Sequence, residues 1–320
     1  MKKALTSLVA LGLAAAPASA QPREINARGP EGELAGTLIP AQEGQPTVLI
    51  IPGSGPTDRD GNNPMGVTAA SYRLLAEALA AKGIGSIRID KRGMFASKGA
   101  VPDANDVTIA VYAEDAHSWI ASAREETGAE CLWLLGHSEG GLVALAAAQE
   151  TDGVCGVLAL ASVGRPAGTI LREQLQANPA NAPILPQALA AIDDLEAGKT
   201  VFVEGMHPAL KGLFNPAVQG FLMDLMSYDP AQLAGALEVP LLIVSGGKDL
   251  QTPVADGEAL HAANAASTFT LIADMNHVLK LVEGDGRATN FATYADPSLP
   301  VHPVLVTAIA RFILAGGESE

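Results

Sequence analysis

The sequence has few aromatic residues and only two cysteines, and both shortages narrow what the protein can be. Aromatics make up 4% of the 320 residues, whereas hydrophobic residues make up 48%. A sizeable core must therefore be built mainly from Ala, Val, Leu and Ile, and the composition is not that of a disordered or fibrous protein. No cluster of cysteine and histidine has the spacing of a metal site, so we predict no bound metal.

Cys131 and Cys155 each stand at the start of an apolar run. A disulfide between them would be stable in an exported protein, and adjacent strands would bring them close. Two buried free thiols explain the same positions, because cysteine packs as a small hydrophobic residue. The sequence leaves both states open, and we favour the free thiols.

Basic residues are also scarce, and long apolar runs are confined to the N-terminus. Lys and Arg number 20 against 35 Asp and Glu, giving a formal net charge of −15. Such a surface repels polyanions, so we expect no nucleic-acid partner. Lys2 and Lys3 precede an apolar run, Ala4 to Ala16, that is too short to span a bilayer, and Ala18-Ser19-Ala20 follows it. This pattern predicts a signal peptide over residues 1–20, an exported protein (periplasmic or secreted) and no integral membrane span.

Short apolar runs typical of strands alternate along the chain with segments of helical periodicity. This alternation predicts a mostly parallel sheet with helices on both faces, an α/β fold. The ligand site of such a sheet lies at the carboxyl ends of its strands. The expected strands are Val48 to Ile51, Gly85 to Asp90, Leu132 to Leu135, Val157 to Ala161, Leu241 to Ser245 and Phe269 to Ile272.

One long segment interrupts the alternation. No strong strand lies between Gly164 and Glu238, where proline-punctuated helical pieces occur instead. We interpret residues of about 165–238 as a helical cap inserted into one α/β domain over residues 21–320, because long insertions between core strands usually shape a pocket. The alternative is an ordinary crossover elaborated into several helices.

The segment Gly136-His137-Ser138-Glu139-Gly140 has the pattern G-x-S-x-G between a predicted strand and a predicted helix. In that setting the serine occupies a sharp, strained turn that lifts its hydroxyl above the sheet, and the flanking glycines make room for the turn. Ser138 is therefore the candidate nucleophile, and we interpret His137 as structural.

A serine nucleophile needs a base, and the base needs a carboxylate to orient it. His277 follows the last predicted strand, and Asp249 follows the strand before it. The order Ser138, Asp249, His277 is the one expected when the serine lies on such a strand-to-helix turn. Asp256 and His302 are the alternative acid and base. His117, His207 and His261 lie in helix-like or cap segments and are less suited to the role.

The tetrahedral oxyanion of acyl transfer needs two backbone donors. The N–H of Glu139, directly after the nucleophile, is the first. The second is expected in the glycine-rich loop that follows Val48 to Ile51. We assign the Ser54 N–H, with Gly53 and Gly55 as alternatives.

At these residues the chain resembles the α/β-hydrolase superfamily, and it is similar to bacterial esterase and lipase-like members grouped near the prolyl-oligopeptidase class. The resemblance spans roughly residues 47–314. It includes the elbow around Ser138, the turn Asp90-Lys91-Arg92-Gly93, which is structural in the family, and the loops carrying Asp249 and His277. Most relatives have His-Gly where this chain has Pro52-Gly53. The resemblance implies an ester or related acyl substrate and no cofactor.

The leading functional hypothesis is a carboxylesterase that forms an acyl-serine intermediate with a small to medium acyl group. A small aminopeptidase or amidase, or a thioesterase, would use the same three residues, and Glu139 is a weak hint of a site for a substrate amine. A catalytically silent binding protein on a hydrolase fold is the non-enzymatic alternative. Neither the native substrate nor the oligomeric state follows from the sequence. Candidate pocket-wall residues, which suit the cap core equally well, are Phe202, Phe214, Phe221, Leu222 and Met226.

Overall fold

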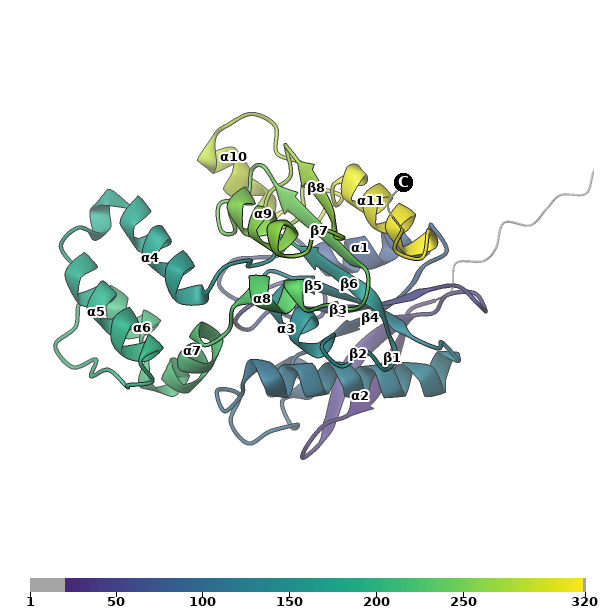
Figure 1. The fold of residues 1–320 in the computed structure, drawn as a ribbon, viewed down its shortest axis with the longest axis horizontal. Coiled ribbons are helices and arrows are strands. Elements are labelled where there is room, and N and C mark those ends of the chain that lie inside the picture. Colours follow the sequence, from purple (N-terminus) through teal and green to yellow (C-terminus); the bar gives the residue numbers. More distant parts are fainter. Residues whose placement is uncertain (1–20, 319–320) are drawn as a thin grey trace, which may run out of the picture.

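The computed structural model describes residues 21–318 and shows one eight-stranded sheet covered by helices on both faces (Figure 1). The strand order is β1-β2-β4-β3-β5-β6-β7-β8. The strands from β4 onward in this order are parallel, whereas β1, β2 and β4 pair antiparallel. This confirms the predicted α/β class. The strands are β1 (Arg23–Arg28), β2 (Glu33–Ile39), β3 (Thr47–Ile51), β4 (Gly85–Ile89), β5 (Leu132–His137), β6 (Val154–Leu160), β7 (Leu241–Gly246) and β8 (Thr268–Ile272).

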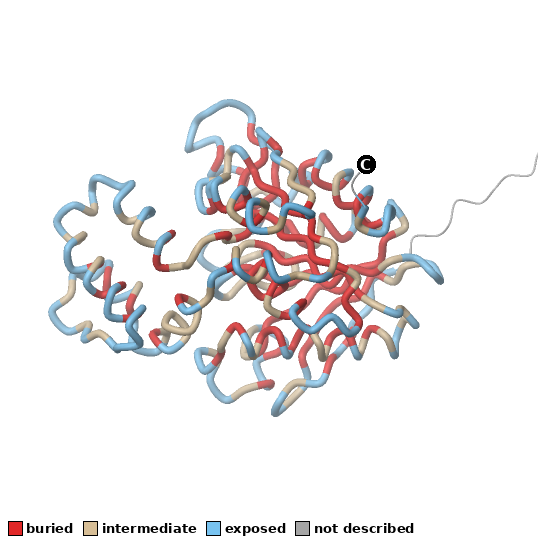
Figure 2. The backbone as a smooth tube through the Cα atoms, in the orientation of Figure 1, coloured by how far each residue is buried: buried red, intermediate tan, exposed pale blue. Residues whose placement is uncertain are grey.

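The central strands are rich in Leu, Ile and Val because both of their faces are buried. Every residue of β3, β4, β5 and β7 is buried, and Figure 2 shows the sheet as a continuous stretch of buried backbone. Strands of this kind appear in a sequence as unbroken apolar runs, which is why they are predictable. Since β3, β5, β7 and β8 run parallel, their carboxyl ends lie along one edge of the sheet.

The N-terminal hairpin β1–β2 is absent from the sequence-based prediction. In β1 only Ile25 and Ala27 are buried, between charged and polar neighbours, so the strand has no apolar run. The hairpin extends the sheet at β4, and Trp119 packs on Gly36 at the point where a β-carbon would lie 2.8 Å from its ring.

Two helical layers enclose the sheet. One face carries α2 (Ile109–Thr127), α3 (Glu139–Ala147), α8 (Pro230–Gly235) and α9 (Val254–Ala263), and the other carries α1 (Ser71–Ala80) and α11 (Pro303–Leu314) (Figure 1). Each layer has its own hydrophobic cluster against the sheet. The helices cover the two faces of the sheet and leave its carboxyl-terminal edge to the loops.

The segment between β6 and β7 forms five α-helices and two short 3-10 helices, and four of the α-helices make a lobe beside the sheet (Figure 1). The lobe has a small hydrophobic core of its own, in which Phe214 and Ile192 are fully buried. Its helices are α4 (Ala167–Ala177), α5 (Leu185–Glu196), α6 (Pro208–Leu213) and α7 (Gln219–Met226). A separate helix, α10 (Arg287–Ala292), follows β8. We refer to α4 to α7 as the cap.

The preference for free cysteines is wrong. Cys131 and Cys155 form a disulfide with their α-carbons 5.3 Å apart. The pairing follows from sheet register, because the neighbouring residues Leu132 and Val154 face each other on β5 and β6. Sequence alone does not give that register.

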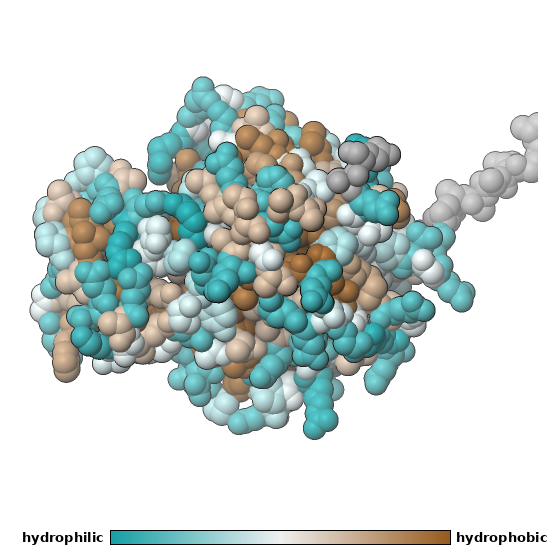
Figure 3. Space-filling view, in the orientation of Figure 1, coloured by the Kyte–Doolittle hydropathy of each residue, from teal (hydrophilic) through white to brown (hydrophobic). Residues whose placement is uncertain are grey.

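The surface facing the viewer mixes hydrophilic and hydrophobic residues without a broad apolar belt (Figure 3). Within residues 21–318, none of the helices combines the length and the apolarity needed to cross a membrane. The predicted signal peptide lies outside the described residues and stays a prediction.

Candidate active site

Ser138 occupies the turn between β5 and α3 with φ 56° and ψ −122°, a strained conformation for a residue with a side chain. The glycines of the motif allow that turn because nearby backbone atoms leave no room for a β-carbon at their positions. A β-carbon on Gly136 would lie 2.0 Å from the Gly140 carbonyl oxygen, and one on Gly140 would lie 2.3 Å from the carbonyl oxygen of Ile51. The turn therefore presents Ser138 at the carboxyl edge of the sheet, next to the end of β3.

Asp249 and His277 meet at this same edge. The Asp249 Oδ2 accepts a hydrogen bond from His277 Nδ1 at 2.8 Å, and the carboxylate side chain is fully buried. Its Oδ1 accepts the backbone N–H groups of Gln251 at 2.7 Å and Thr252 at 2.9 Å. Burial alone would raise the pKa of Asp249, but the nearby His277 and these donors hold it below the usual value. A buried, ionised Asp249 thus holds the proton of His277 on Nδ1, leaving Nε2 as the basic atom.

The alternative acid and base have other partners. Asp256, buried in α9, accepts hydrogen bonds from Arg165 and from the Gly164 N–H, which fixes the start of the cap segment. His302 caps α11 and contacts Asp274 at 3.0 Å. The remaining candidates His117, His207 and His261 line neither of the cavities described below.

The proposed oxyanion donors come from the two sides of Ser138. Glu139 is the first residue of α3, so its N–H has no partner within the helix. Ser54 follows β3 and lines the same cavities as Ser138. The preceding Gly53 lies so close to the elbow that a β-carbon there would stand 3.2 Å from the Ser138 Cβ. A glycine at position 53 is what lets the loop approach the nucleophile.

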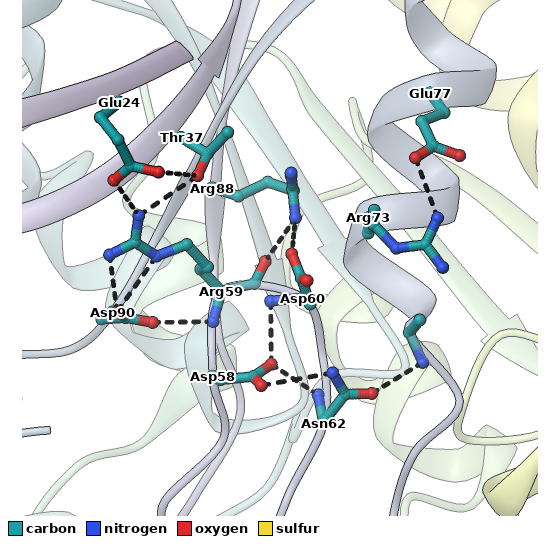
Figure 4. Close-up of polar contacts among 11 residues, drawn as sticks. Glu24, Thr37, Asp58, Arg59, Asp60, Asn62, Arg73, Glu77, Arg88 and Asp90 are labelled. Carbon is teal, nitrogen blue, oxygen red and sulfur yellow. Dashed lines mark hydrogen bonds and ion pairs between the residues drawn. The ribbon is translucent and has the colours of Figure 1, made fainter. Parts of the chain in front are cut away.

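A polar network fixes the loop beyond Ser54 (Figure 4). The Asp58 Oδ1 accepts the N–H groups of Asp60 and Asn62 at 2.9 and 2.8 Å, which closes a tight turn. The Arg59 guanidinium binds the buried Asp90 carboxylate at 2.8 Å and 3.1 Å. Arg88 of β4 adds an ion pair with Asp60. This long loop is therefore anchored to the sheet a few residues beyond Ser54.

A chain of hydrogen bonds through Tyr72 and His137, here called the relay, determines which nitrogen of His137 carries the proton. The Gly53 N–H donates to the Tyr72 hydroxyl oxygen at 3.1 Å, and that hydroxyl is 2.8 Å from His137 Nδ1. His137 Nε2 is 2.8 Å from the His277 carbonyl oxygen, which can only accept. Nε2 must then carry the proton, and Tyr72 donates to Nδ1. Burial lowers the pKa of His137 to about 3, so the ring stays neutral. The relay connects the loop after β3, the turn at Ser138 and the loop that carries His277.

Replacing Tyr72 by Phe should lower the free energy of unfolding by about 1–3 kcal/mol, because two buried groups, the Gly53 N–H and His137 Nδ1, lose their partner. Urea unfolding at pH 7 measures the change. Tyr294→Phe is the matched control, since its hydroxyl accepts from the exposed Gln251 side chain at 3.3 Å. Equal stability of the Tyr72 variant and the unmodified protein would contradict the relay.

Two cavities meet at Ser138, and Ser54 and Gln251 border both. The first, of about 200 Å³, lies on the side of His277 and Tyr294. The second, of about 220 Å³, extends toward the cap. Its apolar wall consists of Leu142, Val163, Ile170, Leu225 and Tyr228. His277 lines the first cavity and not the second, so only the first cavity places a bound group next to this imidazole.

The predicted pocket-wall residues line neither cavity. Phe214, Leu222 and Met226 pack into the cap core, Phe221 packs on Tyr112 of α2, and Phe202 is exposed. The pocket side of the cap is instead formed by Ile170 of α4 and by Leu225, which directly precedes Met226 in α7. The rotation of each cap helix decides this, and short helices with apolar residues on several sides leave that rotation undetermined in the sequence.

Sequence reasoning also missed Tyr72, Thr252 and Lys91. Thr252 donates to Asp249 Oδ2 at 2.7 Å and lies 3.4 Å from His277 Nδ1. Tyr72 lies in α1, an amphipathic helix in which the sequence does not distinguish a buried aromatic residue with a polar role from ordinary core. No group of three or more His, Cys, Asp or Glu side chains in residues 21–318 is arranged to hold a metal ion.

Comparison with known proteins identifies solved structures that share this fold. The α/β hydrolase GrgF from Penicillium sp. sh18 shares the fold with a TM-score of 0.56 at 22% identity, over 80% of this chain and 91% of its own. A thermophilic esterase from Thermogutta terrifontis also gives 0.56, at 20% identity, over 93% and 100%. The chain has the α/β-hydrolase fold. This confirms the fold that the resemblance implies.

Two sequence comparisons agree with the fold. The family model of serine aminopeptidases, S33, matches residues 64–200, a segment of this chain that contains Ser138 but not Asp249 or His277. Esterase EstD of Thermotoga maritima is 27% identical over 285 residues, which is 85% of this chain. The match spans 63% of the length of EstD.

Proposed function

We propose that this α/β-hydrolase is a serine carboxylesterase. The observation that carries the proposal is the buried Asp249–His277 pair at 2.8 Å, which borders the same cavity as the strained Ser138. His277 Nε2 takes the proton of Ser138 as its Oγ attacks the ester carbonyl. The N–H groups of Ser54 and Glu139 stabilise the oxyanion, and His277 returns the proton to the leaving alcohol. Water then hydrolyses the acyl-serine by the same steps.

The two cavities assign the two halves of the ester. The leaving-group oxygen must receive its proton from His277, so the alcohol part belongs in the first cavity, which His277 lines. The acyl chain then extends into the second cavity, where the apolar side chains of Leu142, Ile170 and Leu225 stand among polar ones. A cavity of about 220 Å³ suits a short to medium chain and not a long fatty acid.

An aminopeptidase is less well supported by the charges. Such an enzyme needs an available carboxylate to bind the substrate ammonium. Glu139 is the one carboxylate among the described residues that line the two cavities, and it pairs with Lys91 at 3.4 Å. The name of the matched aminopeptidase family keeps aminoacyl amides in the test below, and the name of EstD supports the ester.

The chain-length profile of hydrolysis tests the proposal. We expect p-nitrophenyl esters from acetate to octanoate to be cleaved, with the optimum at short to medium acyl length, and aminoacyl p-nitroanilides to be cleaved far more slowly. Leu225→Trp, in the second cavity, should lower kcat/KM for octanoate by about tenfold or more relative to acetate. The matched variant Val67→Phe, in the first cavity, should change the preference among alcohols instead. Faster cleavage of the anilides than of every ester would overturn the proposal.

A further inference from the structure

Lys91 is a buried cation beside the nucleophile, and the mechanism above does not use it. Its side chain is 4% exposed, and it stands in the turn after β4. Its Nζ donates to the Gly53 carbonyl oxygen at 2.7 Å, lies 3.4 Å from Glu139 Oε1 and sits 5.3 Å from the centre of the Tyr112 ring. These contacts match the three donors of an ammonium group, so its position is well defined.

The neighbours of Lys91 in the same turn have other partners. Asp90 binds Arg59, and Arg92 binds Asp115 of α2 at 2.6 Å. Lys91 alone of these three contacts Gly53. Asp90 and Arg92 therefore attach the turn to neighbouring parts of the fold, whereas the Lys91 ammonium contacts the loop after β3.

The carbonyl that Lys91 binds belongs to the same peptide group as the Ser54 N–H. A trans peptide is planar, and its C=O and N–H point in opposite directions. An ammonium on the carbonyl oxygen thus fixes the plane of this peptide and directs the Ser54 N–H away from Lys91. It also polarises the peptide, which makes that N–H a stronger donor. The Gly53 N–H is fixed independently by Tyr72 at 3.1 Å.

Lys91 contacts the second proposed donor as well. Glu139 supplies the other N–H of the oxyanion hole, and its own carboxylate lies close to that site with 7% exposure. A buried negative charge there would oppose the developing oxyanion, because low surrounding dielectric strengthens the repulsion. Lys91 offsets this charge while binding the loop on the opposite side of Ser138.

We propose that Lys91 is a positioning residue of the oxyanion hole: it orients the Gly53–Ser54 peptide and keeps a positive potential behind both N–H donors. The inference rests on the proposed serine hydrolase mechanism. The competing explanation is that Lys91 merely neutralises Glu139. The distances favour the proposal, because Nζ is closer to the neutral carbonyl, at 2.7 Å, than to the carboxylate, at 3.4 Å, which is long for a charge-assisted bond.

The test compares Lys91→Met with Lys98→Met, in which an exposed lysine seven residues further along the chain undergoes the same change of charge. Each protein is assayed with p-nitrophenyl butyrate, with a trifluoromethyl ketone that forms a tetrahedral adduct on the nucleophile, and with a fluorophosphonate whose labelling rate is followed. For Lys91→Met we expect kcat to fall by about 10- to 100-fold with little change in KM. The inhibition constant of the ketone should rise by the same factor as kcat/KM falls, a correlation that simple structural damage does not produce. Lys98→Met should behave as the unmodified protein.

The double variant Lys91→Met/Glu139→Gln separates the two explanations. It removes the buried pair of charges together, so it also provides a foldable protein if Lys91→Met does not fold. We expect it to stay slow, with Lys91→Arg recovering part of the rate. Recovery of the full rate in the double variant, or a folded Lys91→Met within threefold of the unmodified protein, would overturn the proposal.

The same assays distinguish a failure of the proposed function from a failure of the role proposed for Lys91. If the unmodified protein reacts with the fluorophosphonate but cleaves no ester, the esterase assignment fails while the labelling rates of the variants still decide the role of Lys91. As the serine Oγ displaces fluoride, negative charge develops on the phosphonyl oxygen in the oxyanion hole, so Lys91→Met must slow the labelling. An unmodified protein that neither reacts nor hydrolyses overturns both.

Discussion

Ser138→Ala should lower kcat for p-nitrophenyl ester hydrolysis by about a million-fold, to the residual rate that binding and the oxyanion donors supply. The alanine keeps the strained elbow, the cavities and the Asp249–His277 pair, because none of these depends on the hydroxyl. What is lost is the nucleophile, and the structure describes no second serine on the elbow. Titration with a fluorophosphonate should label the unmodified protein at one residue and leave the variant unlabelled.

Ser162→Ala is the matched control for this experiment. Ser162 follows β6, is buried close to the elbow, and donates its hydroxyl to the Val163 carbonyl oxygen at 3.2 Å. It lines neither cavity, so its variant should retain kcat within a few-fold. A Ser138→Ala protein that keeps more than about one hundredth of the activity would place the nucleophile elsewhere.

The three proposed catalytic residues could be located from the sequence because each depends on local information and on one rule of topology. Ser138 and Asp249 follow buried apolar strands, and His277 follows β8, a strand whose residues are mostly half-buried. Parallel strands end at a common edge, so residues directly after them meet there even when more than a hundred positions separate them. The fold followed for the same reason, since the core strands are unbroken apolar runs.

What the sequence could not provide depends on orientation and register. The relay through Tyr72 requires knowing that α1 turns this side chain toward Gly53, and the role proposed for Lys91 requires the loop after β3 to pass directly over it. The Cys131–Cys155 bond depends on the pairing of β5 with β6. The cap wall depends on which side of each short helix faces Ser138. In all four cases the residue type is visible in the sequence and its partner is not.

Asp249→Asn is expected to lower kcat by about 10⁴-fold while the fold and KM change little. The present hydrogen bonds determine how the amide would be oriented. Oδ1 accepts two backbone N–H groups, from Gln251 and Thr252, so the amide oxygen must take that position. The amide nitrogen then takes the position of Oδ2, which in the unmodified protein is 2.8 Å from His277 Nδ1. Because that nitrogen is a donor, His277 would have to carry its proton on Nε2, toward Ser138, and could no longer act as a base.

Asp256→Asn provides the comparison, since Asp256 is the other acid that follows β7 and is equally buried. Its partners are Arg165 and the Gly164 N–H, so the substitution should weaken the attachment of the cap and change KM or stability before kcat. Steady-state kinetics on one ester, together with thermal unfolding of both variants, separate the two roles. Loss of kcat in Asp256→Asn with near-normal kcat in Asp249→Asn would transfer the role of acid to α9. A loss confined to Asp249→Asn, with fluorophosphonate labelling slowed to a similar extent, would establish that the carboxylate acts through the proton position of His277.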